Sequence, residues 1–185
     1  MKIIIPIIGC RMHGKDTLVE CITKSLEPSY DIIRFASPLY EALAVLIGST
    51  PEQIKEDIRQ EAEVGKETTR DMLKALAVLA KQNFGDNVLI KAVEAKIPHS
   101  SADVIFIPDT RRQTELEALK NFVKTTAEYK LLSIKITREG YKCDEYELKA
   151  GTDKIRTDIE VLNSDLTQLK ELGEMIATII QKELR

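Results

Sequence analysis

The hydrophobic residues of this chain fall into short unbroken runs that alternate with longer periodic segments. The first run, KIIIPIIG at residues 2–9, is continuous and β-branched, which is typical of a strand covered on both faces in a parallel sheet. Four further apolar runs predict strands at residues 31–36, 102–109, 130–137 and 157–162. The pattern therefore predicts five strands.

Segments with helical spacing separate these runs. We predict helices at residues 16–26, 113–124 and 166–184, and several helices between Pro38 and Ile97. In residues 166–184 the apolar positions recur every three or four residues, which indicates one buried face. Strands that alternate with helices predict an α/β fold with a parallel sheet covered on both sides.

Two intervals interrupt this alternation. The interval between the second and third predicted strands is about 65 residues long, more than one crossover helix needs, and we interpret residues 38–97 as a helical insertion. Within it, Thr50, Pro51 and Gln53 form a helix-start pattern. Residues 138–156 are polar and suit either a mobile flap or a solvated loop. We expect one domain of residues 1–185, with its core at 1–37, 98–137 and 157–185.

Composition narrows the classes of function. The chain has 185 residues, of which 43% are hydrophobic and 31% charged, and its net charge is −3. These values are typical of a globular protein, and the small charge gives no support for nucleic-acid binding. No apolar run approaches the roughly 18 residues that span a bilayer. We expect a cytoplasmic protein without membrane contact, in a host's cytoplasm if it is viral.

The cysteines are few and far apart. Cys10, Cys21 and Cys143 form no CxxC pair, and we find no histidine at metal-ligand spacing. We therefore expect free thiols in a reducing compartment. His13 is interpreted as solvent-facing rather than catalytic.

A phosphate-binding motif follows the first strand. Gly9, Gly14 and Lys15 fit GxxxxGK, and the motif lies between an apolar run and a helix, where its mechanism requires it. Inward-pointing backbone N–H groups and the positive end of the helix create a cavity for phosphate oxygens, and Lys15 adds a full charge. The predicted nucleotide contacts of this stretch are Gly9, Cys10, Arg11, Met12, His13, Gly14, Lys15, Asp16 and Thr17.

Three oxygen-bearing residues are candidates for organising Mg²⁺. Asp16 occupies the position of the usual Ser or Thr, and Thr17 follows it, so either can meet the metal. Asp16 also suits two other roles, compensation of the helix dipole or acceptance of a substrate hydroxyl proton. Asp109 ends the third predicted strand, beside the phosphate loop. No glutamate follows Asp109, which favours transfer to an organic acceptor over hydrolysis.

Arginines recur near the ends of predicted elements. Arg11, Arg111 and Arg138 are placed to neutralise charge on a transferring phosphoryl group, and with Lys15 and Asp109 they form the predicted catalytic set. Arg34 and Arg70 flank the insertion and could bind an acceptor's phosphate.

With these residues in view, the chain resembles the P-loop nucleoside monophosphate kinases, and within them the deoxynucleoside monophosphate kinases of bacteriophages. The resemblance runs in order through GCRMHGKDT, RFASPLYEAL, TTRDMLKALAVLAKQNFGDNVLIKAV, VIFIPDTRRQTELEALK and DIEVLNSDLTQLKEL. It implies transfer of the γ-phosphoryl group of Mg²⁺-bound ATP to a nucleoside monophosphate, with residues 38–97 holding the acceptor and 138–156 acting as a lid.

The resemblance also implies roles for individual residues. Arg70 would bind the acceptor's phosphate, Arg111 would act at the transferring group and Asn163 would lie near the donor adenine. Tyr40 lies where an acceptor base could pass. Ser37 stands where the family usually has an acid, and Asn87 and Val88 replace its Pro-x-Trp region. Both departures concern acceptor binding.

Together these observations predict a three-layer P-loop fold with a five-stranded parallel sheet in the order 2-3-1-4-5. The same architecture resembles dephospho-coenzyme A kinase and phosphomevalonate kinase, so another small acceptor is an alternative. A nucleotide-binding module without catalysis is a second alternative. The acceptor's base and sugar, and assembly into a homodimer, stay open.

Overall fold

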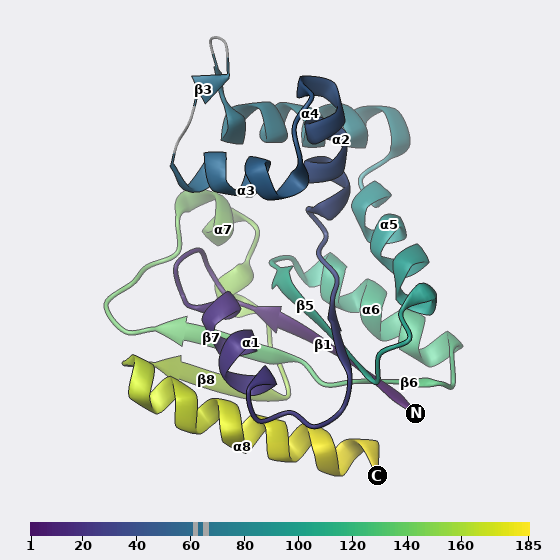
Figure 1. Cartoon of the computed structure of the whole chain (residues 1–185), viewed down its shortest axis with the longest axis vertical. Coiled ribbons are helices and arrows are strands. Elements are labelled where there is room, and N and C mark those ends of the chain that lie inside the picture. Colours follow the sequence, from purple (N-terminus) through teal and green to yellow (C-terminus); the bar gives the residue numbers. More distant parts are fainter. Residues whose placement is uncertain (61–62, 65–66) are drawn as a thin grey trace. The chain divides into compact units, whose positions relative to one another are not determined.

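The computed structural model describes residues 1–60, 63–64 and 67–185 (Figure 1), and the four others lie within the predicted insertion 38–97. Contacts divide the chain into two compact units. The first consists of Met1–Arg34 and Lys96–Arg185, and the second of Phe35–Ala95. Within the described part of the chain, none of the helices combines the length and apolarity that a membrane crossing needs.

The first unit is built on a parallel sheet with the order β2-β5-β1-β7-β8. The strands are β1 (Lys2–Ile8), β2 (Tyr30–Ile32), β5 (Val104–Thr110), β6 (Tyr129–Leu131), β7 (Ile134–Arg138) and β8 (Ile159–Asn163). Strand β6 also pairs with β1, and every pairing in this sheet is parallel. The predicted α/β fold and strand order are confirmed, with β1 at the centre.

The predicted fourth strand, residues 130–137, is divided into β6 and β7. Ser133 lies at the break, where its backbone N–H and its hydroxyl donate to Asp158 Oδ2 at 2.8 and 2.6 Å. Strand β6 pairs with Lys2–Ile4 of β1, and β7 pairs with Ile7 and Ile8 beyond Pro6. Pro6 has no N–H to donate, and the register of β1 against β5 also shifts between Pro6 and Ile8. The change of pairing partner from β6 to β7 and the register shift against β5 therefore both occur at Pro6 in the central strand.

The second predicted strand, 31–36, is shorter than expected. Strand β2 ends at Ile32, although the Ile33 N–H still donates to Phe106 O at 3.0 Å. The chain then leaves the sheet, because Pro38 stands in the first turn of the following helix, which begins at Ser37.

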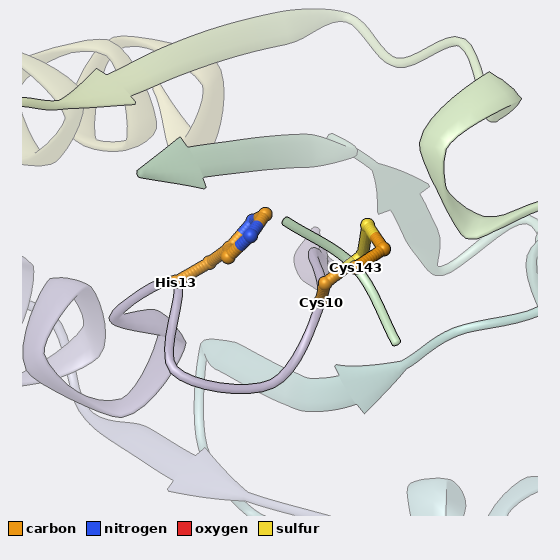
Figure 2. Close-up of side chains that lie close together, drawn as sticks. All are labelled: Cys10, His13 and Cys143. Atoms are coloured by element: carbon orange, nitrogen blue, oxygen red, sulfur yellow. A yellow bond between two sulfur atoms is a disulfide. The ribbon is translucent and has the colours of Figure 1, made fainter. Parts of the chain in front are cut away.

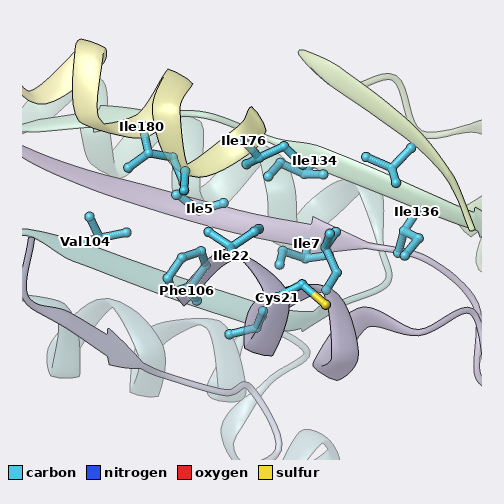
Figure 3. Close-up of a cluster of buried hydrophobic side chains, with 14 of the residues drawn as sticks. Ile5, Ile7, Cys21, Ile22, Val104, Phe106, Ile134, Ile136, Ile176 and Ile180 are labelled. Atoms are coloured by element: carbon cyan, nitrogen blue, oxygen red, sulfur yellow. The ribbon is translucent and has the colours of Figure 1, made fainter. Parts of the chain in front are cut away.

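Helices cover both faces of the sheet. Helices α1 (Lys15–Thr23) and α8 (Leu166–Leu184) pack with Ile3, Ile5 and Ile7 of β1 in one apolar cluster (Figure 3). Ile8 instead joins Leu116 of α6 (Gln113–Thr125) in a second cluster. Alternate residues of β1 therefore face different helical layers, which explains why its apolar run is unbroken. Each fully buried isoleucine contributes roughly 1.5–3 kcal/mol.

Two helical elements follow β7, within the predicted lid at 138–156. They are α7 (Glu145–Lys149) and the 3₁₀ turn η2 (Thr152–Lys154). Glu147 and Thr152 are both 1% exposed. This stretch therefore has buried anchors and is not a uniformly solvated loop.

The second unit is mainly helical. It contains α2 (Ser37–Ile47), α3 (Pro51–Arg59), the short antiparallel strands β3 (Glu63–Val64) and β4 (Glu67–Thr68), and α4 (Thr69–Phe84). Helix α5 (Val88–Lys96) runs to the unit boundary, and the 3₁₀ turn η1 (Ile97–His99) follows it. Leu43, Ala44 and Ile54 form an apolar cluster. The Thr50 hydroxyl accepts a hydrogen bond from Gln53 N at 3.2 Å, which confirms the predicted helix start.

Candidate phosphate-binding site

The predicted phosphate loop, residues 9–14, joins the end of β1 to the start of α1. A Cβ at Gly9 would lie 2.6 Å from the carbonyl oxygen of Ile136, so only glycine fits there. Gly14 has a φ of 95° and Met12 a φ of 66°, both in the left-handed region. Such a conformation is unfavourable for a side chain like that of Met12. The backbone of the loop is thus held in a curled shape, as the motif predicts.

Lys15 starts α1 and folds back over the loop. Its Nζ donates to Gly9 O at 2.7 Å and to Cys10 O at 2.8 Å, and the residue is 8% exposed. Burial is the main cause that lowers the pKa of Lys15 to about 8, and the charge of Arg111 acts in the same direction. The ammonium group therefore lies inside the loop. A bound phosphate would replace the two carbonyl oxygens as its hydrogen-bond acceptor.

The carboxylates of Asp16 and Asp109 both act to raise the pKa of Lys15, so both lie near its ammonium group. Asp16 is largely exposed in the first turn of α1, and its Oδ1 accepts a hydrogen bond from Arg34 at 2.6 Å. Thr17 follows on α1, and Asp109 lies near the end of β5. The structure therefore brings carboxylates from two elements to the phosphate loop.

Glu147 of α7 is a site residue that the sequence analysis did not predict. Its Oε1 accepts a hydrogen bond from the Arg11 backbone N–H at 2.7 Å and lies 3.5 Å from NH1 of Arg111. Its second oxygen accepts from the Asp144 N–H at 3.3 Å, within a capping box. The sequence holds the D-x-x-E spacing of that box, but this spacing indicates only a helix start. A backbone N–H of the phosphate loop thus donates its hydrogen bond to a buried carboxylate.

Arg111 and Arg138 reach the loop from strands on opposite sides of β1. The N–H of Arg111 donates to Glu115 Oε2 at 2.8 Å, and its carbonyl accepts from the Thr152 hydroxyl at 2.7 Å, so its backbone is fixed on both sides. NH1 of Arg138, at the end of β7, donates to Met12 O at 3.4 Å. Two guanidinium groups therefore border the loop.

Asn163, at the end of β8, supports the loop from behind. The residue is buried, and its Nδ2 donates to His13 O at 3.0 Å. A Cβ at Gly14 would lie 2.6 Å from that nitrogen, so Asn163 and Gly14 are closely fitted. The role near the donor adenine that the resemblance implies stays a prediction.

The prediction of three free thiols is wrong for two of them. Cys10 in the loop and Cys143 after β7 form a disulfide across 133 residues of chain, with 5.3 Å between their Cα atoms. The folded sheet brings the ends of β1 and β7 together, which sequence spacing alone does not reveal. Cys21 is free and buried against α8.

The prediction that His13 faces solvent is also wrong. His13 is 4% exposed, and its Nδ1 lies 3.3 Å from the carbonyl oxygen of Ile136. Figure 2 shows His13 and Cys10 on the same loop, with Cys143 reaching Cys10 from another segment. The imidazole is therefore buried beside a backbone carbonyl of β7.

Three predicted acceptor-binding residues lie in the second unit. Ser37 begins α2, and Tyr40 of the same helix has Lys55 Nζ 5.9 Å from its ring centroid. NH2 of Arg70, in the first turn of α4, donates to Ile58 O at 3.3 Å. Arg34, the fourth predicted acceptor residue, ends the first segment of the first unit.

The chain matches no protein-family model and no curated protein sequence. Among solved structures it is similar to shikimate kinase from Aquifex aeolicus, with 14% identity over 98% of each chain and a TM-score of 0.48. It is also similar to a sugar kinase from a Janibacter species, with 12% identity over 98% of this chain and 95% of that chain, and a TM-score of 0.42. Likenesses this distant fix neither the fold nor the chemistry of this chain.

Proposed function

We propose that this chain binds ATP at residues 9–17 and transfers the γ-phosphoryl group to a small organic acceptor. The observation that carries the proposal is the loop at the end of the central strand, which is closed by Gly9 and Gly14 and contains the buried Lys15. A loop of this kind, followed by a helix N-terminus, is suited to phosphate.

The charges around the loop support transfer. Lys15 would exchange its two carbonyl contacts for phosphate oxygens, and Arg111 and Arg138 would lie close enough to neutralise the charge that spreads over the transferred group. Arg11, whose side chain is exposed on the loop, adds a further cation. The positive groups come from the loop itself, from α1, from the end of β7 and from the segment after β5.

The oxygen donors around the loop suit Mg²⁺. Asp16, Thr17 and Asp109 are proposed to hold it, since hard divalent cations prefer oxygen ligands and both carboxylates act on Lys15. When bound, Mg²⁺ would neutralise phosphate charge. The residues themselves would orient the nucleotide's phosphates toward the arginines.

We further propose that the acceptor is a nucleoside monophosphate, and that Arg34, Ser37, Tyr40 and Arg70 hold it. This step rests on the resemblance of RFASPLYEAL and TTRDML to the corresponding segments of nucleoside monophosphate kinases. Arg34 gives it some physical support, because its guanidinium group already lies 2.6 Å from Asp16, beside the phosphate loop.

The test is ADP release from Mg·ATP over a panel of ribonucleoside and deoxyribonucleoside monophosphates. We expect turnover with at least one of them, and a fall in kcat/KM of at least about 100-fold in Lys15→Ala, because a charge at the transferring group is lost. Lys24→Ala is the control, since Lys24 is exposed just after α1. Turnover that Lys15→Ala leaves unchanged would contradict the proposal.

The same panel separates the acceptor classes. It is extended with dephospho-coenzyme A and phosphomevalonate as other phosphorylated acceptors. Turnover with only one of these two acceptors would support the proposed kinase activity but exclude a nucleoside monophosphate as the acceptor. ATP binding without transfer to any acceptor would instead indicate a nucleotide-binding module.

A further inference from the structure

Three side chains of metal-ligating type meet beside the phosphate loop. The ligand atoms of Cys10, His13 and Cys143 all lie within 4.8 Å of one another (Figure 2). Cys10 and His13 are nine-tenths buried or more, and Cys143 is half-buried. We propose that, in the reduced protein, these three residues, the Cys10–His13–Cys143 cluster, bind one Zn²⁺ ion. The sequence analysis noted no histidine at metal-ligand spacing, whereas the fold brings His13 within 4.8 Å of both cysteines.

The buried imidazole carries the strongest evidence. His13 Nδ1 lies 3.3 Å from the carbonyl oxygen of Ile136, which can only accept, so the proton belongs on Nδ1. The lone pair then belongs to Nε2, which is buried and has no hydrogen-bond partner in the described part of the chain. An imidazole oriented by a backbone carbonyl through one nitrogen, with the other left free, is the usual arrangement of a zinc ligand.

The ligand types select the cation. Two thiolates and one imidazole suit Zn²⁺ rather than Mg²⁺ or Ca²⁺, which prefer oxygen. Cys10 and His13 have the Cys-x-x-His spacing that lets one tight loop supply two ligands. Tetrahedral Zn²⁺ with ordinary bond lengths needs about 3.8 Å between two sulfurs and about 3.6 Å between sulfur and nitrogen. The 4.8 Å limit of the cluster allows the separation between sulfur and nitrogen, and the two sulfurs, which are bonded in the disulfide, would move apart to about 3.8 Å after reduction.

Zinc binding requires that the Cys10–Cys143 disulfide first be reduced. Two equivalents of a thiol such as glutathione supply two electrons, the S–S bond breaks, and two cysteine thiols and one oxidised glutathione result. Zn²⁺ then replaces the two thiol protons, which are released to solvent. Disulfide and zinc are therefore alternative links between the same two segments.

The fourth coordination position would be open to water, since the cluster supplies three protein ligands. With either link, Cys143 holds the segment that begins after β7 against the phosphate loop. Glu147 lies four residues further on, at the Arg11 N–H. Cys10 and His13 belong to the proposed ATP-binding loop, but they would bind zinc through their side chains, and zinc binding is measured without nucleotide. The outcome of the zinc experiment is therefore separate from that of the kinase assay.

The experiment uses the full chain, reduced and freed of metal. Zn²⁺ affinity and stoichiometry are measured by competition with a chromophoric chelator, and Co²⁺ is added as a spectroscopic probe. We expect one Zn²⁺ per chain, Co²⁺ spectra with thiolate charge-transfer bands and the intense visible bands of four-coordinate cobalt, and no such binding after oxidation. The Co²⁺ measurement needs only the wild-type chain and so does not depend on how variants fold.

Variants then test each ligand. We expect Cys143→Ser and His13→Gln to weaken Zn²⁺ binding at least about 100-fold, since even loss of a group that only orients a ligand costs 10–100-fold. The matched controls are Cys21→Ala, the free cysteine, and His99→Gln, an exposed histidine, and both should bind as the wild type does. The proposal is overturned if the reduced wild type binds no Zn²⁺ in this way, or if His13→Gln binds it equally well.

Discussion

The phosphate loop at residues 9–14 and the segment at residues 139–156 lie against each other but are held in different ways. The loop is fixed by backbone geometry, with a glycine at Gly9 that no side chain can replace and a left-handed backbone at Gly14. The segment is fixed by side chains that reach out from it, namely Cys143 to Cys10, Glu147 to Arg11 N and Thr152 to Arg111 O.

This difference explains why the phosphate loop could be predicted from the sequence and the contacts of residues 139–156 could not. Backbone constraints select glycine at fixed spacing next to a strand and a helix, and such local patterns are readable. A cysteine, a glutamate and a threonine can have many surroundings, and only their partners give them a structural role. The predictions below test whether the segment depends on those side chains and the loop on its backbone.

The largest expected effect comes from opening the disulfide. Reduction in the presence of a metal chelator should lower the free energy of unfolding by roughly 4 kcal/mol, because the unfolded chain loses a cross-link spanning 133 residues. Denaturant unfolding with and without reductant measures this effect. Cys143→Ser should have the stability of the reduced wild type, and reductant should not change it. Cys21→Ala should lose stability on reduction as the wild type does. Equal stability of the oxidised and reduced wild type would show that the link is dispensable.

A somewhat smaller effect is expected from a methyl group in the loop. Gly9→Ala should cost roughly 3 kcal/mol, because its Cβ would lie 2.6 Å from a backbone oxygen of β7 that cannot move freely. Gly140→Ala, in the other region, should cost only about 1 kcal/mol, because its surroundings are open and only its positive φ opposes a side chain. Denaturant unfolding compares the two, and equal costs would mean that the loop tolerates movement of β7.

The smallest expected effect concerns the charge of Glu147. Glu147→Gln keeps an oxygen for the Arg11 N–H but loses the attraction to Arg111, whose side chain is 38% exposed. Solvent weakens that attraction, so we expect a loss of about 1 kcal/mol. Glu145→Gln, on the exposed side of the same helix, should change stability by less than about 0.5 kcal/mol. Equal stability of the two variants in unfolding measurements would show that the charge of Glu147 does not stabilise the fold.

The sheet itself was largely predictable. Strands β1 and β5 are almost wholly buried, and such strands must be apolar without interruption, so their runs were easy to recognise. The other apolar runs also indicated strands, although β2 is exposed. Helix α8 was predicted with its observed bounds. The order with β1 at the centre also agreed. The division of residues 130–137 was not foreseen, because it depends on Pro6 of the neighbouring strand β1 and on how Ser133 meets Asp158.

The sequence by itself determined the strands, the main helices and the glycine-rich loop with Lys15, because each depends on neighbours in the chain and on a repeating choice between apolar and polar. Only the tertiary structure decided that Cys10 meets Cys143, that His13 turns inward and that Glu147 occupies a loop N–H. These contacts join residues more than 100 positions apart. They arise because parallel strands bring the loops at their carboxyl ends to one edge of the sheet, and no local pattern records which side chains meet there.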